Sequence, residues 1–260
     1  MSTPPISQYN DKLAVWCQHE SDFTQLNSLA NSLAVPLYQS IDKHTPEVFF
    51  LTYRDDCLKL LDKELLKKGG LTVDIQPRAG EQRSYPAPKQ GNLAKALGRK
   101  TKTIVDATTG WGQDALFMFR MGYQVQCIER SEIMAALLGD AFQRLNQVDW
   151  MQSLNLQAPK LSQGNAIELL ANLEASPDCI YLDPMFPPKR KKSALAKKSM
   201  QILQELLGQD EDKEQLFEAA FKATAKRVVV KTPDYAKPLG GKPDESFKGK
   251  LLRYDVYFKK

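Results

Sequence analysis

The fold of this chain is decided by residues 103–115, which read TIVDATTGWGQDA. The apolar start predicts a strand that ends in the acid Asp106, and a helix is predicted to begin at Gln113. Between them, Gly110 and Gly112 permit a tight turn and let a ligand approach the backbone closely. A strand, a glycine-containing turn and a helix in this order are typical of a nucleotide-type site in an α/β protein.

From about residue 92 onward the chain alternates strands with helices. Strands are predicted at 103–107, 124–129, 160–162, 179–182, 227–231 and 253–258, and helices at 113–121, 131–145, 194–207 and 213–224. Ser131 is expected to cap the second of these helices. Strands separated by helices imply a parallel sheet that is covered on both faces. Ligands bind beyond the carboxyl ends of such strands, where Asp106 and Asp183 both lie.

Residues 1–90 are predicted to form a small α+β subdomain with its linker, and residues 91–260 the main domain. Strands of the small subdomain are expected at 13–17, 48–53, 57–61 and 71–75. Ser21 is expected to cap a helix whose apolar residues recur at helical spacing up to Leu33. The stretch 77–91 is rich in proline and glycine and is interpreted as the connection between the two parts.

The composition is that of an ordinary globular protein. Of the 260 residues, 42% are hydrophobic and 26% are charged, and the net charge is +5. No run of about 18 apolar residues occurs and no signal peptide is visible, so we expect a cytoplasmic protein without a membrane span. The four cysteines fit no zinc spacing and the two histidines lie outside any cluster, so we expect no metal site.

The acids around the glycine turn favour a cationic ligand. Asp106 ends the strand and Asp114 lies in the first helical turn, where carboxylates would repel the pyrophosphate of a dinucleotide. S-adenosylmethionine carries a sulfonium and an ammonium, and we therefore prefer it to NAD. Glu129 ends the next strand 17 residues after Gly112, near the distance at which a carboxylate meets ribose hydroxyls. A nicotinamide dehydrogenase is disfavoured because no His, Tyr or Lys constellation for hydride chemistry is visible.

A second motif, DPMFP at residues 183–187, follows the apolar run 179–182. Asp183 can accept a hydrogen bond from an exocyclic amine, together with the backbone carbonyls of Pro184 and Met185. The ring of Phe186 can stack on a base, so we expect Asp183 and Phe186 to be catalytic. An isolated Asp-Pro could also be only a tight turn after a strand.

A basic run begins two residues after this motif. Six positive residues fall within ten positions that contain no acid: Lys189, Arg190, Lys191, Lys192, Lys197 and Lys198. Clustered positive charge suits a polyanion, so we expect the first four to bind phosphates around a target base. A solvated loop is the alternative interpretation of the run.

Taken together, residues 106–115, 128–130, 181–187 and 227–236 resemble the ribosomal RNA small subunit methyltransferase J family. The resemblance implies a Rossmann-like class I methyltransferase with a central, mostly parallel seven-stranded sheet. It also implies methylation of a guanine N2 amine in 16S ribosomal RNA, free or in the small ribosomal subunit, with S-adenosylmethionine as methyl donor. The family's cofactor contacts would fall on Gln113, Asp114, Glu129, Arg130, Asn165, Ala166 and Asp183.

The chain departs from the family pattern at two of these places. The family often has arginine in place of Gln113, and serines in place of Asn165 and Ala166. Asn165 can still hydrogen-bond an adenine edge, and Ala166 can still offer its backbone.

Two other functions are compatible with the sequence. One is an amino-methyltransferase that acts on DNA adenine or cytosine, or on a protein side chain. The other is a non-catalytic RNA-binding or ribosome assembly module that keeps the fold.

Overall fold

The computed structural model describes residues 12–62, 69–76, 85–184, 186 and 212–260. It divides into two compact units. Unit 1 comprises Met1–Ile75 and Ala136–Leu156, and unit 2 comprises Gln76–Ala135 and Gln157–Lys260. This division differs from the expected one in two respects, since the first boundary falls at residue 75 and unit 1 also takes a segment from the middle of the chain.

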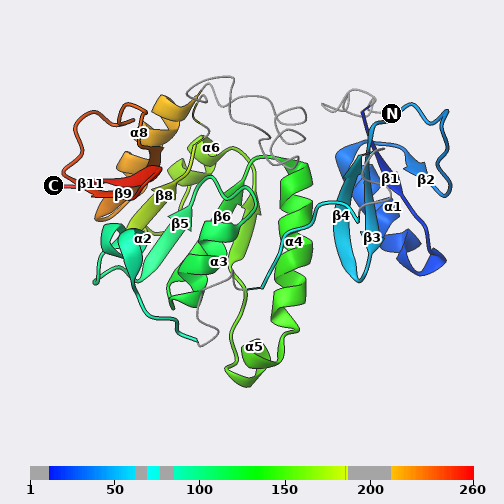
Figure 1. The fold of residues 1–260 in the computed structure, drawn as a ribbon, viewed down its shortest axis with the longest axis horizontal. Coiled ribbons are helices and arrows are strands. Elements are labelled where there is room, and N and C mark those ends of the chain that lie inside the picture. Colours follow the sequence, from blue (N-terminus) through cyan, green and yellow to red (C-terminus); the bar gives the residue numbers. More distant parts are fainter. Residues whose placement is uncertain (1–11, 63–68, 77–84, 185, 187–211) are drawn as a thin grey trace. The chain divides into compact units, whose positions relative to one another are not determined.

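Unit 2 is built on a seven-stranded sheet, as expected (Figure 1). The strands lie in the order β10-β11-β9-β8-β5-β6-β7. Their bounds are β5 Thr103–Asp106, β6 Gln124–Glu129, β7 Lys160–Gln163, β8 Cys179–Leu182, β9 Arg227–Pro233, β10 Glu245–Lys248 and β11 Leu252–Phe258. The strands from β9 to β7 are mutually parallel, whereas β11 runs antiparallel to β9 and β10 antiparallel to β11. The sheet is therefore mostly parallel, and the α/β class is confirmed.

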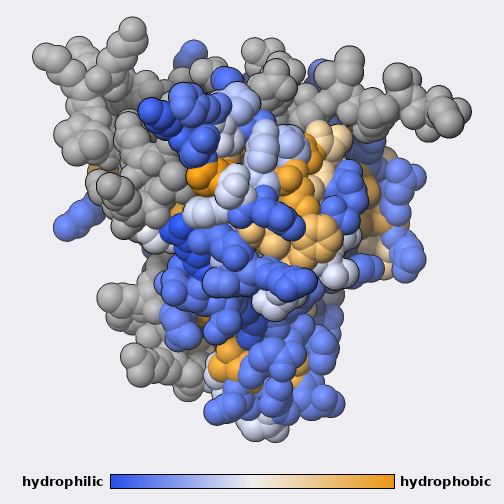
Figure 2. Space-filling model, turned by 90° about the vertical axis from the view of Figure 1, so that its right-hand side faces the viewer, coloured by the Kyte–Doolittle hydropathy of each residue, from blue (hydrophilic) through white to orange (hydrophobic). Residues whose placement is uncertain are grey.

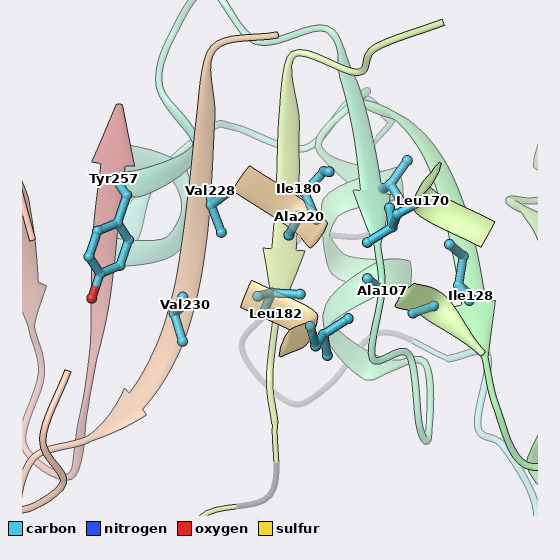
Figure 3. Close-up of a cluster of buried hydrophobic side chains, with 12 residues drawn as sticks. Ala107, Ile128, Leu170, Ile180, Leu182, Ala220, Val228, Val230 and Tyr257 are labelled. Atoms are coloured by element: carbon cyan, nitrogen blue, oxygen red, sulfur yellow. The ribbon is translucent and has the colours of Figure 1, made fainter. Parts of the chain in front are cut away.

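Helices cover both faces of this sheet (Figure 1). The described helices of unit 2 are α2 Gly91–Leu97, α3 Gln113–Arg120, α6 Ala166–Ala171 and α8 Lys213–Ala223, together with the first turn of α4 Glu132–Asn146. Helices α6 and α8 pack on one face, where a cluster of buried residues forms the core (Figure 3). Side chains alternate along a strand, so Tyr181 and Val229 point to the opposite face from Ile180 and Val228. Full burial of one aliphatic side chain of this core, such as Ile180 or Val228, stabilises the fold by about 1.5–3 kcal/mol.

The helix starts of unit 2 follow from local chemistry. Ser131 caps α4, as expected, and its Oγ accepts a hydrogen bond from Met134 N (3.3 Å). Asn165 caps α6 in the same way through Ile167 N (3.0 Å). Helices α2 and α6 and strand β10 were not expected from the sequence, because their apolar patterns are short. The helix expected at 194–207 lies outside the described residues.

Unit 1 holds a four-stranded sheet in the order β2-β1-β3-β4. The strands are β1 Leu13–Trp16, β2 Leu37–Tyr38, β3 Phe49–Arg54 and β4 Cys57–Asp62, and the expected hairpin is β3 with β4. A 3-10 turn, η1 Glu20–Asp22, leads into α1 Phe23–Leu33, and α5 Asp149–Ser153 follows the end of α4. Figure 2 shows one face of the molecule, on which a group of hydrophobic residues is bordered by hydrophilic ones.

Two predictions for unit 1 are wrong. Ser21 lies within η1 and donates its hydroxyl to Asp22 Oδ1 (3.1 Å), so it does not cap α1. Residues 71–75 form no strand apart from a single bridge between Leu71 and Leu60. The carbonyl of Val73 instead accepts a hydrogen bond from Arg144 of α4 (2.9 Å), which removes it from any sheet ladder.

Candidate active site

The site is organised by two neighbouring parallel strands, β5 and β8, at their carboxyl ends. The chain continues from β5 to β6 on one side and from β8 to β9 on the other, so the strand order reverses between them. Such a reversal is where open α/β sheets bind ligands. Asp106 is the last residue of β5 and Asp183 directly follows β8. The two segments are joined because Asp183 N donates to Thr108 Oγ1 (2.6 Å).

The glycine loop between β5 and α3 has an open surface. Gly110 and Gly112 have φ angles of 52° and 68°, in the left-handed region that glycine adopts without strain. A side chain added at Gly110 would meet nothing closer than Thr108 O, at 3.9 Å. Gly112 N donates to Thr109 O (2.8 Å), which closes the turn just before α3. The loop therefore combines a fixed shape with space for a ligand against its backbone.

Glu129, at the end of β6, holds this loop in place. Its Oε2 accepts from Gly110 N (2.7 Å) and its Oε1 accepts from Ser131 N (2.8 Å). A carboxylate oxygen can accept more than one hydrogen bond. The expected role of Glu129 towards a ribose is compatible with this geometry, and the carboxylate also has a structural task that the sequence did not indicate.

The carboxylates gathered here influence one another. Asp106 is 1% exposed, and burial raises the pKa of its carboxyl well above the ordinary value. The negative charges of Asp114, Asp183 and Glu129 raise this pKa further, while the hydrogen bond from Thr108 N lowers it. Burial favours the neutral form of Asp106, so the bias of the site towards a positively charged ligand comes from the other three acids, Asp114, Asp183 and Glu129.

Lys231 of β9 connects two of these acids. Its Nζ lies 2.7 Å from Asp114 Oδ2 and 2.7 Å from Asp183 Oδ2. Asp114 Oδ2 also accepts a hydrogen bond from Tyr181 Oη (2.7 Å). One ammonium therefore compensates part of the negative charge of Asp114 and Asp183, a pairing that the sequence did not indicate. Tyr181 is fully buried and was not indicated as a site residue, since it reads as one more apolar residue of its strand.

The pKa of Asp183 reflects this partly buried position. Burial raises the pKa of its carboxyl, the Lys231 ammonium opposes the rise, and Asp114 adds to it. Lys231 itself loses hydration on burial, which lowers its pKa, but the two carboxylates outweigh this and raise it. The lysine therefore stays charged and the pair of acids shares one positive charge.

The remaining expected cofactor residues lie around the ends of β6 and β7. Gln113 is the first residue of α3, and Ala166 is the buried first residue of α6. Asn165 uses its Oδ1 to cap α6. Arg130 is partly exposed and forms an ion pair with Asp212 (2.9 Å), while its carbonyl accepts from Gln163 Nε2 (3.4 Å). Glu129, Arg130 and Asn165 are thus close, since Gly164 N also donates to Glu129 O (2.9 Å).

The expected substrate residues are only partly described. Pro184 is buried, and Phe186 is half-buried and packs against the core cluster next to α8. Lys213 Nζ lies 5.6 Å from the centroid of the Phe186 ring. Met185, Lys189, Arg190, Lys191 and Lys192 lie outside the described residues. Within the described ranges no group of three or more His, Cys, Asp or Glu side chains has an arrangement that could hold a metal ion, and no helix is long and apolar enough to cross a membrane.

The donor set suits S-adenosylmethionine. The open backbone at Gly110 gives space for a ligand. The carboxylates of Glu129 and Asp183 attract positive charge and accept from hydroxyl or ammonium groups, and the single Lys231 offsets only part of the charge of Asp183 and Asp114. This is the chemistry that the sulfonium, ammonium and ribose of the cofactor require.

Comparison with known proteins agrees with this chemistry. Residues 37–259 match the family model described as "Putative SAM-dependent methyltransferase". Ribosomal RNA small subunit methyltransferase J of Shewanella amazonensis is 40% identical over 220 residues, which cover 81% of this chain and 87% of the relative. The protein of the same name from Coxiella burnetii is 36% identical over 256 residues, which cover 96% of this chain and 98% of the relative.

A solved structure shows the same fold. The crystal structure of a SAM-dependent methyltransferase from Neisseria gonorrhoeae has a TM-score of 0.66 and 24% sequence identity, and covers 94% of this chain and 95% of its own. The family model and the curated relatives each extend over most of the chain, and the range of the family model includes the glycine loop, both acidic strand ends and β9. The chain therefore belongs to the ribosomal RNA small subunit methyltransferase J family of S-adenosylmethionine-dependent methyltransferases.

Proposed function

We propose that this protein transfers a methyl group from S-adenosylmethionine to the exocyclic N2 amine of a guanosine in 16S ribosomal RNA. The observation that carries the proposal is the position of Asp183, whose carboxylate lies at the strand-order reversal beside the glycine loop and is joined to it through Thr108. The names of the relatives supply the class of RNA, and the family resemblance supplies the guanine amine.

The cofactor would be held by the residues that surround the glycine loop. When bound, S-adenosylmethionine supplies a methyl group activated on a positively charged sulfur. Gly110, Gly112 and Gln113 offer backbone, Glu129 accepts from ribose hydroxyls, and Asn165 with the Ala166 backbone meets the adenine edge. Asp106, at the end of β5, Asp114, in the first turn of α3, and Arg130, directly after β6, would complete the set of residues around the cofactor.

Asp183 would recognise and orient the amine that accepts the methyl group. The lone pair of the guanine amine is delocalised into the ring, so the amine is a poor nucleophile. A hydrogen bond from one N–H to the Asp183 carboxylate turns the lone pair outward and stabilises the positive charge that develops during transfer. The carbonyls of Pro184 and Met185 would accept the second N–H.

The ring of Phe186 would hold the base in the plane that this hydrogen bond requires. Base stacking on an aromatic side chain contributes about 1–3 kcal/mol. A base leaves an RNA stack at a cost of a few kcal/mol, and one stacked ring together with phosphate contacts offsets that cost. Phe186 is suited to the task because one side of it packs on the core and its position is thereby fixed.

We expect Lys189, Arg190, Lys191 and Lys192 to bind phosphates on either side of the target base, because six positive residues stand together directly after the site motif. The affinity for RNA should then fall steeply with salt, by roughly 0.7 in log K per log salt for each phosphate bound to a single strand. Measurement of this slope for the protein and for a variant with all four residues changed to glutamine tests the expectation. An unchanged slope would show that these four residues do not bind phosphate and would favour the alternative interpretation of the run as a solvated loop.

The function is tested with methyl-labelled S-adenosylmethionine and separate preparations of 16S ribosomal RNA, 30S subunits, DNA and protein. Label in RNA or subunits, with mass mapping that places it on the N2 of one guanosine, is the expected result. Label only in DNA or only in protein would show that the substrate is that macromolecule and not ribosomal RNA. Failure of the protein to bind the cofactor in calorimetry would instead support a non-catalytic RNA-binding or assembly module.

A further inference from the structure

Four polar groups form a continuous chain behind the glycine loop. Tyr181 Oη donates to Asp114 Oδ2, Lys231 Nζ donates to the same oxygen, and Lys231 Nζ also donates to Asp183 Oδ2, each at 2.7 Å. Tyr181 belongs to β8, Asp183 directly follows that strand, Asp114 lies in α3 and Lys231 in β9. They are brought together although Asp114 and Lys231 are 117 positions apart. The side chain of Lys231 is 23% exposed and that of Asp114 is 14% exposed, so water screens these contacts only partly.

We infer that Lys231 is a positioning residue for methyl transfer: its ammonium holds the Asp183 carboxylate by Oδ2, at 2.7 Å, and so presents the other oxygen to the amine. The inference rests on the proposed function, in which Asp183 accepts the amine hydrogen bond. A carboxylate fixed at Oδ2 still has the lone pairs of Oδ1 available as acceptors. Lys231 does not touch the substrate in this role and acts through Asp183.

Asp114 serves as the second anchor of the lysine. A lysine side chain has a flexible four-carbon stem, and a single partner would leave its ammonium free to rotate away. The carboxylate of Asp114 is itself fixed by Tyr181, whose burial raises the pKa of the phenol well above its ordinary value and keeps it a donor. Asp114 therefore fixes the Lys231 ammonium, and the ammonium in turn fixes the Asp183 carboxylate.

The charge balance also suits the reaction. Two carboxylates share one ammonium, so the group of Asp114, Asp183 and Lys231 carries one net negative charge when all three are ionised. That remaining charge still favours a positively charged methyl donor nearby. A second lysine would cancel this negative charge. Without Lys231, burial and the charge of Asp114 would raise the pKa of Asp183 and nothing would oppose them.

The other titratable groups around Asp183 do not take the place of Lys231. Asp106 of β5, Asp114 of α3 and Glu129 of β6 are all acids. Tyr181 of β8 and Tyr254 of β11 stand next to this group as phenols. Within the described part of the chain, Lys231 is thus the cation paired with Asp183, and its loss should raise the pKa of that carboxyl.

The inference is tested with Lys231→Met and Lys231→Arg, and with Lys226→Met as the matched control. Lys226 precedes the other end of the same strand, where it pairs with Asp178 (2.6 Å) and is 49% exposed. For Lys231→Met we expect kcat to fall about 10- to 100-fold with little change in the KM for RNA. The acid limb of its kcat–pH profile should move to higher pH, because the ammonium that lowers the pKa of Asp183 is gone. Lys231→Arg should restore part of the rate, and Lys226→Met should leave both readouts unchanged.

Titration of the Asp183 carboxyl by carbon NMR gives a readout that is independent of activity. The expected result is a higher pKa in Lys231→Met than in the unchanged protein. An unmoved carboxyl titration together with an unmoved acid limb would overturn the inference, even if the rate fell. If the unchanged protein methylates no ribosomal RNA but the carboxyl titration still shifts, the proposed function fails while the Lys231–Asp183 coupling stands.

Discussion

Exchange of Asp183 for asparagine is expected to slow methyl transfer by about a thousandfold. The variant keeps the size and shape of the side chain, but the amide carries no charge to stabilise the positive charge that develops on the attacking amine. Its NH₂ group would also face the Lys231 ammonium or the substrate amine, and either contact is repulsive. Single-turnover transfer of a labelled methyl group to 16S ribosomal RNA measures the effect.

Cofactor binding separates this role from a general loss of structure. Asp183 joins the glycine loop through its backbone N–H, which asparagine keeps, so the affinity for S-adenosylmethionine in calorimetry should fall much less than the rate. Asp183→Ala should abolish transfer in the same way. Undiminished turnover by either variant would rule out the assignment of Asp183.

Replacement of Arg253 by methionine is expected to have the largest effect on stability, a loss of about 3–5 kcal/mol in the free energy of unfolding. Arg253 Nε donates to both oxygens of Asp255 (2.9 and 3.0 Å), whose side chain is fully buried. Its other nitrogens donate to the carbonyls of Pro233, Asp234 and Ala236, at 2.8–3.1 Å. Among the side chains that the structure describes, methionine would leave the buried Asp255 carboxylate with the Ser246 hydroxyl as its hydrogen-bond donor, and three carbonyls would lose the guanidinium.

Urea unfolding of the whole protein measures this loss of stability, and two further variants identify its cause. Arg253→Lys keeps the charge but cannot reach three carbonyls and a carboxylate at once, so it should recover little of the stability. Arg253→Met combined with Asp255→Leu should recover a substantial part, because the uncompensated buried charge is removed. Equal stability of the single and the double variant would contradict this account.

Much of the fold could be predicted from the sequence because its strands are short apolar runs that alternate with helical patterns. Strands β6 and β8 were expected at their observed bounds, and β5 within one residue. The capping of α4 by Ser131 was also predictable, since it depends on adjacent residues. The error at residues 71–75 arose where a distant contact, the hydrogen bond from Arg144 to the Val73 carbonyl, competed with a local strand preference. At Ser21 the competing contact is local, because its hydroxyl donates to the neighbouring Asp22.

The site could be predicted only as far as strand ends reveal it. Asp106, Glu129 and Asp183 are visible in the sequence because each follows an apolar run and therefore lies at the carboxyl edge of the sheet. The pairing of Lys231 with Asp114 and Asp183 depends on the register of β8 with β9 and on where α3 crosses the sheet. No spacing in a single sequence carries that information, and Tyr181 is hidden for the same reason.

The strand order also sets a problem for folding. Strands β5, β6 and β7 come from one continuous stretch, residues 103–163, and can pair as soon as that stretch is available. The edge of β5 that does not face β6 stays unpaired until β8 joins the sheet, and this pairing joins Ile104 to Cys179, 75 positions later in the chain. Such long-range pairing is slow to form, and an open apolar edge is prone to join a second chain. Aggregation during refolding should therefore begin at β5, the strand that carries Asp106 of the candidate site.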